Sequence, residues 1–320
     1  MILLVSLLSF SLCFVLVPPV IALSWRIGAV DVPSDWRRMH HESIARGGVI
    51  AIYLAFALSL LALEGVSLPG ASLLAGGLLM LLVGLADDIF CLGAWVKLFF
   101  QVTVTVATVL GSGAAEGRGA IFAVFWVVTL TNAHNFVDGL DGLLAGTGAI
   151  EGAALWLAHL LSGRGDASAA PLLLALACLA FRYFNRYPAV VFAGDCGSGV
   201  VGFLLGMLSL PLFSTSVTTP AVLSPLLIFA YPLTDLVTAV VRRLLRGKSP
   251  FSADRAHLHH RITAAGLTHV QCGGVLLAIS AGLAVVGVLV CAGWLLPSAL
   301  ASLAAALLLI GLRRFILDFS

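Results

Sequence analysis

The stretch that decides the fold is residues 47–63, which read GGVIAIYLAFALSLLAL and contain no charged side chain. An apolar run of this length can cross the hydrocarbon core of a bilayer as a helix, for which about 17 to 25 residues are needed. Comparable runs recur along the chain. Residues 300–309 do not alternate between polar and apolar side chains, as the strands of an outer-membrane barrel would. We therefore expect a helical membrane protein.

The composition leads to the same conclusion. Of the 320 residues, 61% are hydrophobic and 10% are charged, whereas soluble domains carry about 25% charged residues. This excludes a water-soluble enzyme, a disordered scaffold and a nucleic-acid binder, which needs a basic surface. The six cysteines form no Cys-x-x-C pair, so neither a disulfide framework nor a zinc site is indicated.

Eleven apolar runs predict an all-α polytopic membrane protein with about eleven transmembrane helices. They lie near residues 2–23, 47–63, 69–86, 94–111, 119–132, 144–161, 170–183, 199–214, 221–241, 272–291 and 295–312. The first run lacks a basic segment before it and a clear cleavage site, so we interpret it as a retained helix and not a signal peptide.

The basic residues predict the orientation. With eleven spans, 15 of the 17 Lys and Arg residues lie on one side, and Arg118 and Arg164 alone lie on the other. Because Lys and Arg gather in cytoplasmic loops, we expect the N-terminus outside and the C-terminus in the cytoplasm. Residues 1–320 then form a single membrane domain. We expect its active site in cytoplasmic loops at about 24–46, 87–93, 132–143, 184–198 and 242–271.

An acid pair ends the third predicted span. Asp87 and Asp88 lie at the C-terminal end of that helix, where the helix dipole disfavours each anion by about 0.3–1 kcal/mol. A nearby cation must offset this, and Lys97 opens the next span. The pair is either a solvated helix end or part of a cation or substrate site.

A polar motif follows the fifth predicted span. Asp138 and Asp141 are three residues apart, and Asn132 and Asn135 repeat that offset, so four oxygen-bearing side chains can converge. Oxygen ligands in this number favour Mg²⁺ or Mn²⁺ over zinc. Each Asp is followed by Gly, so ordinary turns remain the alternative.

A glycine-rich turn precedes the eighth predicted span, with the sequence Gly194-Asp195-Cys196-Gly197-Ser198. Backbone N–H groups at the positive end of a helix can receive phosphate oxygens, and Asp195 could bind the metal that neutralises them. A plain N-cap by Asp195 or Ser198 is the alternative.

The longest cytoplasmic loop, residues 242–271, is rich in Arg and His. His257, His259 and His260 suggest zinc, but no Cys or further His completes a tetrahedral set at the usual spacing. With Arg255, they fit better a loop that contacts phosphate and sugar hydroxyls.

The first cytoplasmic loop contributes Asp31, Arg38, His40 and Arg46-Gly47-Gly48. On its own it is equally consistent with an ordinary basic loop on the cytoplasmic side of a membrane protein.

Together these motifs resemble those of the polyprenyl-phosphate N-acetylhexosamine-1-phosphate transferases. The resemblance is carried, in order and on one predicted face, by residues 87–98, 132–142, 194–198 with Gly202-Phe203, and the Arg/His loop 242–271. It covers nearly the whole chain. Residues 249–260 are similar to those of bacterial enzymes that initiate lipid-linked glycans with UDP-GlcNAc or a related UDP-N-acetyl sugar.

The resemblance implies transfer of a sugar-1-phosphate from a UDP-N-acetylhexosamine to polyprenyl (undecaprenyl) phosphate, with release of UMP. It implies Mg²⁺, or Mn²⁺, and a bacterial inner (plasma) membrane location with the active site facing the cytoplasm. The partners are then these two substrates and the lipid bilayer, without nucleic acid, and a homodimer remains open. The alternatives are the transferase of phospho-muramoyl-pentapeptide and, from another class, a lipid-linked sugar transporter or flippase.

The resemblance also suggests residue roles. It assigns catalysis to Asp87, Asp88, Lys97, Asp138 and Asp141. It assigns the metal to Asp195, Asn135 and Asn132. It assigns nucleotide-sugar or phosphate binding to Asn185, Gly194, Ser198, Arg255, His257, His259, His260, Arg38 and His40. A phosphate monoester is already largely dianionic at neutral pH, so we expect Asp87 or Asp88 to orient the acceptor and not to remove a proton. A covalent aspartyl intermediate remains open.

Overall fold

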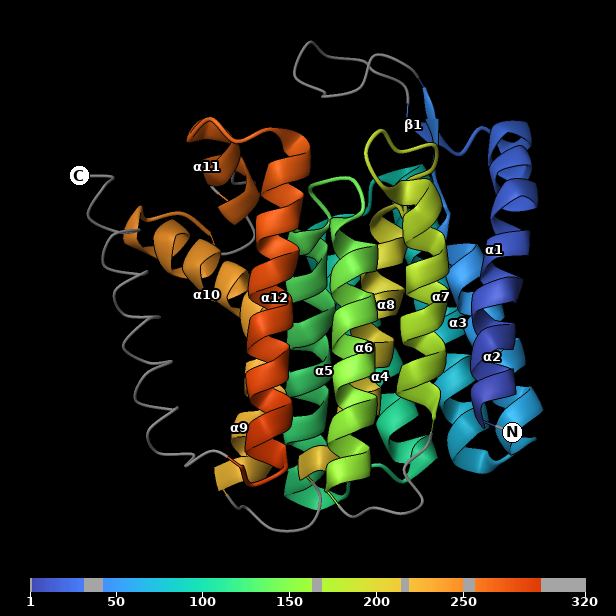
Figure 1. Ribbon diagram of the computed structural model, residues 1–320, viewed down its shortest axis with the longest axis vertical. Helices are drawn as coiled ribbons and strands as arrows, with labels where there is room; N and C mark the ends of the chain where they lie inside the picture. The colour runs from blue at the N-terminus through green and yellow to red at the C-terminus, as the bar shows by residue number, and fades with distance from the viewer. Residues whose placement is uncertain (1, 32–42, 163–168, 214–218, 250–256, 295–320) are drawn as a thin grey trace.

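The protein is a bundle of helices (Figure 1). The computed structural model describes residues 2–31, 43–162, 169–213, 219–249 and 257–294. The helices are α1 (Ile2–Ile27), α2 (Val49–Glu64), α3 (Leu68–Phe90), α4 (Ala94–Ser112), α5 (Gly117–Val137), α6 (Leu143–Leu161), α7 (Ala170–Asn185), α8 (Asp195–Ser209), α9 (Thr219–Ile228), α10 (Ala230–Leu245), α11 (Leu258–Ala264) and α12 (His269–Cys291). A 3-10 helix, η1 (Leu210–Phe213), follows α8.

The all-α membrane class is confirmed. By length and composition, seven of the described helices are long and apolar enough to cross a membrane, and the α9–α10 pair brings the number to eight. Two further apolar helices, α2 and α7, have 16 residues each and lie alongside the longer ones (Figure 1). The predicted span 295–312 lies outside the described residues, so the count of eleven stays a prediction.

Local signals fix several helix ends. The side chain of Ser67 accepts a hydrogen bond from the Gly70 amide at the start of α3, with Pro69 in the first turn. Thr268 and Gln271 form a capping box at the start of α12. These caps lie at turns that reverse the chain. Successive loops of the bundle lie at alternate ends (Figure 1).

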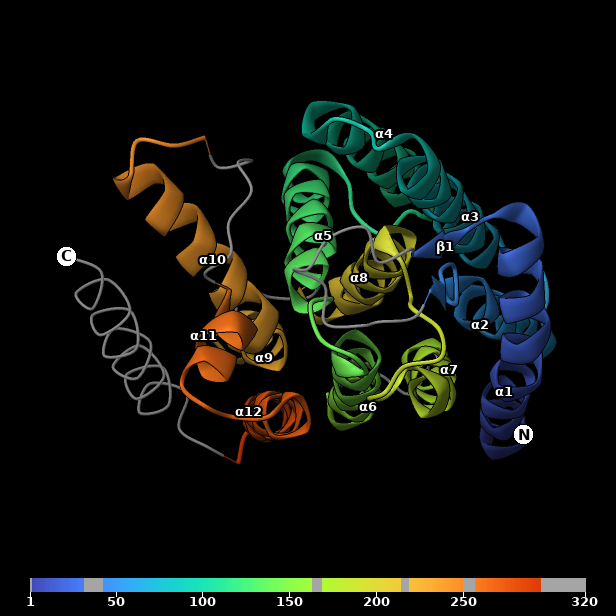
Figure 2. The ribbon, with the colours of Figure 1, turned by 90° about the horizontal axis from the view of Figure 1, so that it is seen from above.

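The centre of the bundle is α8, which is enclosed by its neighbours in the view along the helices (Figure 2). Glycines allow this close packing. A Cβ at Gly84 of α3 would collide with Cys196, and a Cβ at Gly202 of α8 would lie 2.8 Å from the Leu130 carbonyl oxygen of α5. Helix α8 therefore packs closely against both α3 and α5.

The predicted ninth span, 221–241, is not one straight helix. The chain bends by 80° between α9 and α10, with Phe229 between them, so the predicted span consists of two helices. Pro232 lies in the first turn of α10. It has no N–H with which to continue the hydrogen-bond ladder from α9, which favours a new helix start. As a result, α10 slopes away from the bundle (Figure 1).

Several predicted loops are shorter than expected because the helices continue into them. Helix α5 runs to Val137, so Asn132 and Asn135 are helical, and the loop itself is residues 138–142. Polar side chains do not end a membrane helix where they face a cavity instead of lipid. Between α7 and α8 the loop is residues 186–194.

We call the end of the bundle that carries loops 91–93, 138–142 and 186–194 the site end. Two short antiparallel strands lie there, β1 (Val30–Asp31) and β2 (Ile44–Ala45). A bridge joins Ala45 to Val191, and the Phe192 amide donates to the Ala45 carbonyl oxygen at 2.9 Å. The first loop is therefore tied by its backbone to loop 186–194.

Candidate active site

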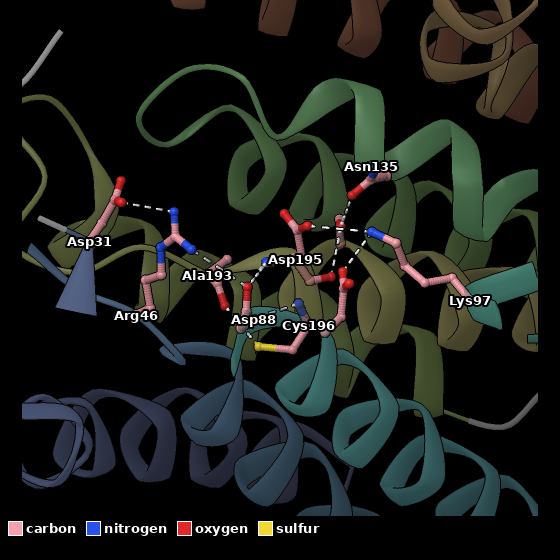
Figure 3. Close-up of polar contacts among 10 residues, drawn as sticks. Asp31, Arg46, Asp88, Lys97, Asn135, Ala193, Asp195 and Cys196 are labelled. Atoms are coloured by element: carbon pink, nitrogen blue, oxygen red, sulfur yellow. Dashed lines mark hydrogen bonds and ion pairs between the residues drawn. The ribbon is translucent and has the colours of Figure 1, made fainter. Parts of the chain in front are cut away.

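The acid cluster is built around Lys97. Its Nζ lies 2.6 Å from Asp87 Oδ2 and 3.7 Å from Asp195 Oδ2, so one cation bridges the ends of α3 and α8 (Figure 3). Asp87 is buried, whereas the side chain of Asp195 is 57% exposed. The expected cation beside the acid pair is therefore present, and Asp195 is the carboxylate most open to a ligand.

Asp88 has a different set of partners, on the backbone of α8. Its Oδ1 accepts a hydrogen bond from the Asp195 amide at 3.1 Å, and its Oδ2 accepts one from the Cys196 amide at 3.4 Å (Figure 3). Gly194 precedes them with φ +81°, and a Cβ there would lie 2.7 Å from Asp88 Oδ2. The Asp88 carboxylate of α3 therefore caps the start of α8 and occupies the amides that were expected to receive a phosphate. The helix dipole favours an anion at this position.

Arg46 also belongs to this site, although its sequence motif alone did not assign it a role. Its guanidinium lies 2.9 Å from Asp31 Oδ1 and 3.9 Å from Asp88 Oδ1 (Figure 3). The signal was the run Arg46-Gly47-Gly48, but only the β1–β2 pairing shows that it reaches the acid pair.

The two asparagines of α5 face the same region. Asn135 Oδ1 accepts a hydrogen bond from the Ser198 hydroxyl at 2.8 Å. Asn132 Nδ2 donates to Gln101 Oε1 on α4 at 2.8 Å. The amide oxygen of Asn135 thus lies beside the first turn of α8, next to the Asp195 end of the cluster (Figure 3).

Asp138 and Asp141, which the motif pairs, have different surroundings. Burial, together with the negative charges of Asp195 and Asp88, raises the pKa of Asp138 to about 7. Asp141 instead bonds to neighbouring loops: its Oδ2 accepts the Ala189 amide at 3.0 Å, and its own amide donates to His269 Nε2 at 3.1 Å.

Asn185 also holds backbone. Its Oδ1 accepts the Gly142 amide at 3.0 Å, and its Nδ2 donates to the Val191 carbonyl oxygen at 2.8 Å. Since the residue is 3% exposed, it serves in this structure to join loop 138–142 to loop 186–194.

The histidine loop packs against loop 138–142. His257 Nδ1 lies 3.3 Å from Asp235 Oδ2 of α10, and its ring is 4.7 Å from that of Phe136. The ring of His259 lies so close to Gly139 that no Cβ fits there. Burial, with the charge of His260, lowers the pKa of His259 to about 4, so its ring is neutral near pH 7. Three other predicted site residues, Arg38, His40 and Arg255, lie outside the described residues.

A cavity of about 910 Å³ joins these groups to the apolar part of the bundle. At the site end it is lined by Asp87, Lys97, Asn135, Asp195 and His257, and farther down by Val102, Phe125, Val128, Leu236 and Val240 of α4, α5 and α10. It therefore combines a charged end with an apolar channel.

Comparison with known proteins places this architecture in a family. Residues 71–213 match the model of glycosyl transferase family 4. The chain is 32% identical over 272 residues to a probable undecaprenyl-phosphate N-acetylglucosaminyl 1-phosphate transferase of Bacillus subtilis, covering 80% of this chain and 75% of that protein. It is 33% identical to the decaprenyl-phosphate N-acetylglucosaminephosphotransferase of Mycolicibacterium smegmatis, over 77% of this chain and 71% of that one.

A third relative is the undecaprenyl-phosphate alpha-N-acetylglucosaminyl 1-phosphate transferase of Yersinia pestis, 31% identical over 88% of this chain and 81% of the relative. The acid cluster and α5 motif lie within the segment matched to the family. The chain therefore belongs to glycosyl transferase family 4, the polyprenyl-phosphate N-acetylhexosamine-1-phosphate transferases.

Proposed function

We propose that the protein transfers N-acetylglucosamine-1-phosphate, or a related N-acetylhexosamine-1-phosphate, from the UDP-sugar to polyprenyl phosphate, releasing UMP. The observation that carries this proposal is the cavity whose charged end contains Asp195 and Lys97 and whose walls below are apolar. A lipid phosphate fits such a shape, with its head at the acids and its tail between α4, α5 and α10. The names of the three relatives support the same reaction.

The main obstacle to the reaction is repulsion, because a phosphate oxygen must attack a diphosphate. Lys97 and Arg46 supply positive charge at the site, and both are held by side-chain carboxylates. When phosphate oxygens arrive, these cations can bind them without breaking any backbone hydrogen bond. We therefore assign charge stabilisation to Lys97 and Arg46.

The two acids of the pair take separate roles in this proposal. Asp88 uses both oxygens to hold the first amides of α8, so it sets the position of Asp195. Asp87 accepts a hydrogen bond from Lys97 at the cavity wall and holds no backbone amide of α8 in the contacts described above. Asp87 is therefore the better candidate to orient the acceptor phosphate through Lys97.

Divalent metal is part of the proposal, and the oxygen donors at the site fit Mg²⁺ or Mn²⁺. Among the described residues no three His, Cys, Asp or Glu side chains gather at metal-binding distances. This agrees with Mg²⁺, which keeps several waters and takes one or two carboxylates plus substrate phosphates. Asp195 would hold the ion, with the amide oxygens of Asn135 and Asn132 nearby. A bound ion would neutralise the diphosphate and the leaving UMP.

We further propose that the site end faces the cytoplasm of a bacterial inner membrane. Of the basic residues that the structure describes, Arg118 lies at the start of α5, at the opposite end, while Arg26, Arg46, Lys97 and Arg186 lie at the site end. Single cysteines at Arg118 and Lys248 test this. An impermeant thiol reagent added to intact cells should label position 118 and not 248, and the reverse result would contradict the orientation.

The reaction is tested by incubating the purified protein in detergent with undecaprenyl phosphate, Mg²⁺ and a panel of UDP-N-acetylhexosamines. We expect release of UMP and a lipid product whose mass corresponds to polyprenyl diphosphate plus N-acetylhexosamine. Turnover only with UDP-N-acetylmuramoyl-pentapeptide would favour the peptidoglycan branch. Movement of a lipid-linked sugar across proteoliposomes without UMP release would favour a flippase.

A further inference from the structure

A second cavity, of about 630 Å³, lies at the site end beside the start of α6, between α7 and α12. These three helices lie on the side of the bundle opposite to α4 (Figure 2). The residues that line the cavity include Arg182, Arg186, Tyr187, His269, Gly274 and Leu277. We call this cavity the α6–α7–α12 recess. It lies outside the acid cluster.

The recess carries the positive charge of two arginines. Arg182 and Arg186 are one helical turn apart at the end of α7, and among the described residues neither has a carboxylate at ion-pair distance. The guanidinium of Arg186 lies 5.0 Å from the centre of the Tyr183 ring. Asp141 also lines the recess, but its Oδ2 already accepts the Ala189 amide and its Oδ1 lies 3.9 Å from His269 Nε2.

The same recess has the exposed apolar and aromatic groups typical of a membrane interface. Tyr183 and Tyr187 are 55% and 51% exposed, and Val270 is 61% exposed. Tyrosines occupy the headgroup level of membrane proteins because one end of the ring is apolar and the other is polar. Below them, a Cβ on Gly274 of α12 would meet no atom within 4 Å. Arginines therefore lie at the rim and open apolar space lies beneath.

We propose that the α6–α7–α12 recess binds the phosphate of an anionic bilayer phospholipid, with an acyl chain along α12. A soluble anion would gain nothing from the apolar floor, whereas a phospholipid uses both parts of the recess. The Tyr187 ring stacks on His269 at 4.7 Å, and the His269 ring accepts the Asp141 amide. A bound lipid would therefore brace loops 138–142 and 186–194. This inference goes beyond the proposed transfer reaction and does not depend on it.

The test measures thermal unfolding of the delipidated protein in detergent, with added phosphatidylglycerol or phosphatidylcholine at equal mole fraction. We expect phosphatidylglycerol, and not phosphatidylcholine, to raise Tm. An arginine near an anionic headgroup contributes about fivefold to affinity, so R182Q/R186Q should bind phosphatidylglycerol about 25-fold more weakly. Arg26→Gln is the matched control. It removes a basic residue from the last turn of α1, outside the recess, and should keep the lipid effect.

Two further variants separate binding from folding. Arg186→Gln alone changes an exposed residue at a helix end. Gly274→Leu keeps both arginines, fills the open space and improves helix propensity, so it should fold while losing most of the lipid effect. The proposal is overturned if both variants keep the full phosphatidylglycerol effect, if phosphatidylcholine acts equally, or if inorganic phosphate replaces the lipid. An arginine-dependent effect of polyprenyl phosphate without one of phosphatidylglycerol would also overturn it.

Discussion

Two groups of polar side chains at the site end bind different kinds of partner. In the acid cluster, Asp87 and Asp195 face the side chain of Lys97. In the neighbouring loops, Asp141 and Asn185 bind backbone groups. A side-chain cation can exchange its partner for a phosphate, whereas a backbone amide that loses its partner loosens a loop. The first group is therefore suited to bind ligands and the second to hold the site in shape.

The largest effect that tests this comparison is expected from Asp195→Asn. A neutral amide cannot supply the charge that a divalent ion and a diphosphate require, so turnover at saturating Mg²⁺ should fall by about a thousandfold or more. The side chain of Asp195 is 57% exposed and its pairing with Lys97 is long, at 3.7 Å, so Tm should change little. UMP release and a melting curve measure both. If the variant instead kept activity within about threefold of the parent, Asp195 would not belong to the site.

The next effect concerns Lys97. Replacing it by Gln leaves Asp87 buried without its cation and removes positive charge from the cavity, and we expect kcat/KM to fall by about a hundredfold. Lys97→Arg keeps the charge and should restore part of the loss. Equal activity of the Gln and Arg variants would show that the charge of this residue does not matter.

In the group that binds backbone, Asn185→Ala should lower the stability of the protein. It leaves the Gly142 amide and the Val191 carbonyl oxygen without their partner, which costs about 1–3 kcal/mol for a buried group. A lower Tm in detergent is the expected readout, with Asp195→Asn as the control that keeps Tm. If Asn185→Ala kept Tm but lost UDP-sugar binding, the residue would belong to the first group.

The smallest effect is a pH dependence at His259. Its folded pKa of about 4 lies below the usual 6.5, so the unfolded chain binds the proton first and stability falls as pH drops from 6.5 toward 4. Between pH 6 and pH 5 the loss from this group is about 1 kcal/mol. His259→Gln should flatten the stability profile over this window, and an unchanged slope would show that the ring titrates normally.

The helical bundle could be predicted from the sequence, and so could the location of Asp87, Asp195 and Asn135 at one end of it. Successive apolar runs cross the membrane in alternate directions, so they determine which loops lie on the same side. It did not predict that Arg46 reaches Asp88, since that contact depends on the pairing of two short strands. It also could not pair His134 with Glu151, whose side chains meet at 2.7 Å inside the bundle. Such contacts depend on helix rotation, which periodicity defines poorly in uniformly apolar spans.

The bend between α9 and α10 has a consequence for the range of lipids that the protein can accept. Leu236 and Val240 of the diverging helix form one wall of the larger cavity, and Phe125, which also lines it, is 67% exposed toward the outside of the bundle. A channel that opens sideways in this manner contacts only the first part of a long hydrocarbon. On the proposed function, the remaining isoprene units extend into the surrounding bilayer, and carriers that differ in chain length would be equivalent to the enzyme.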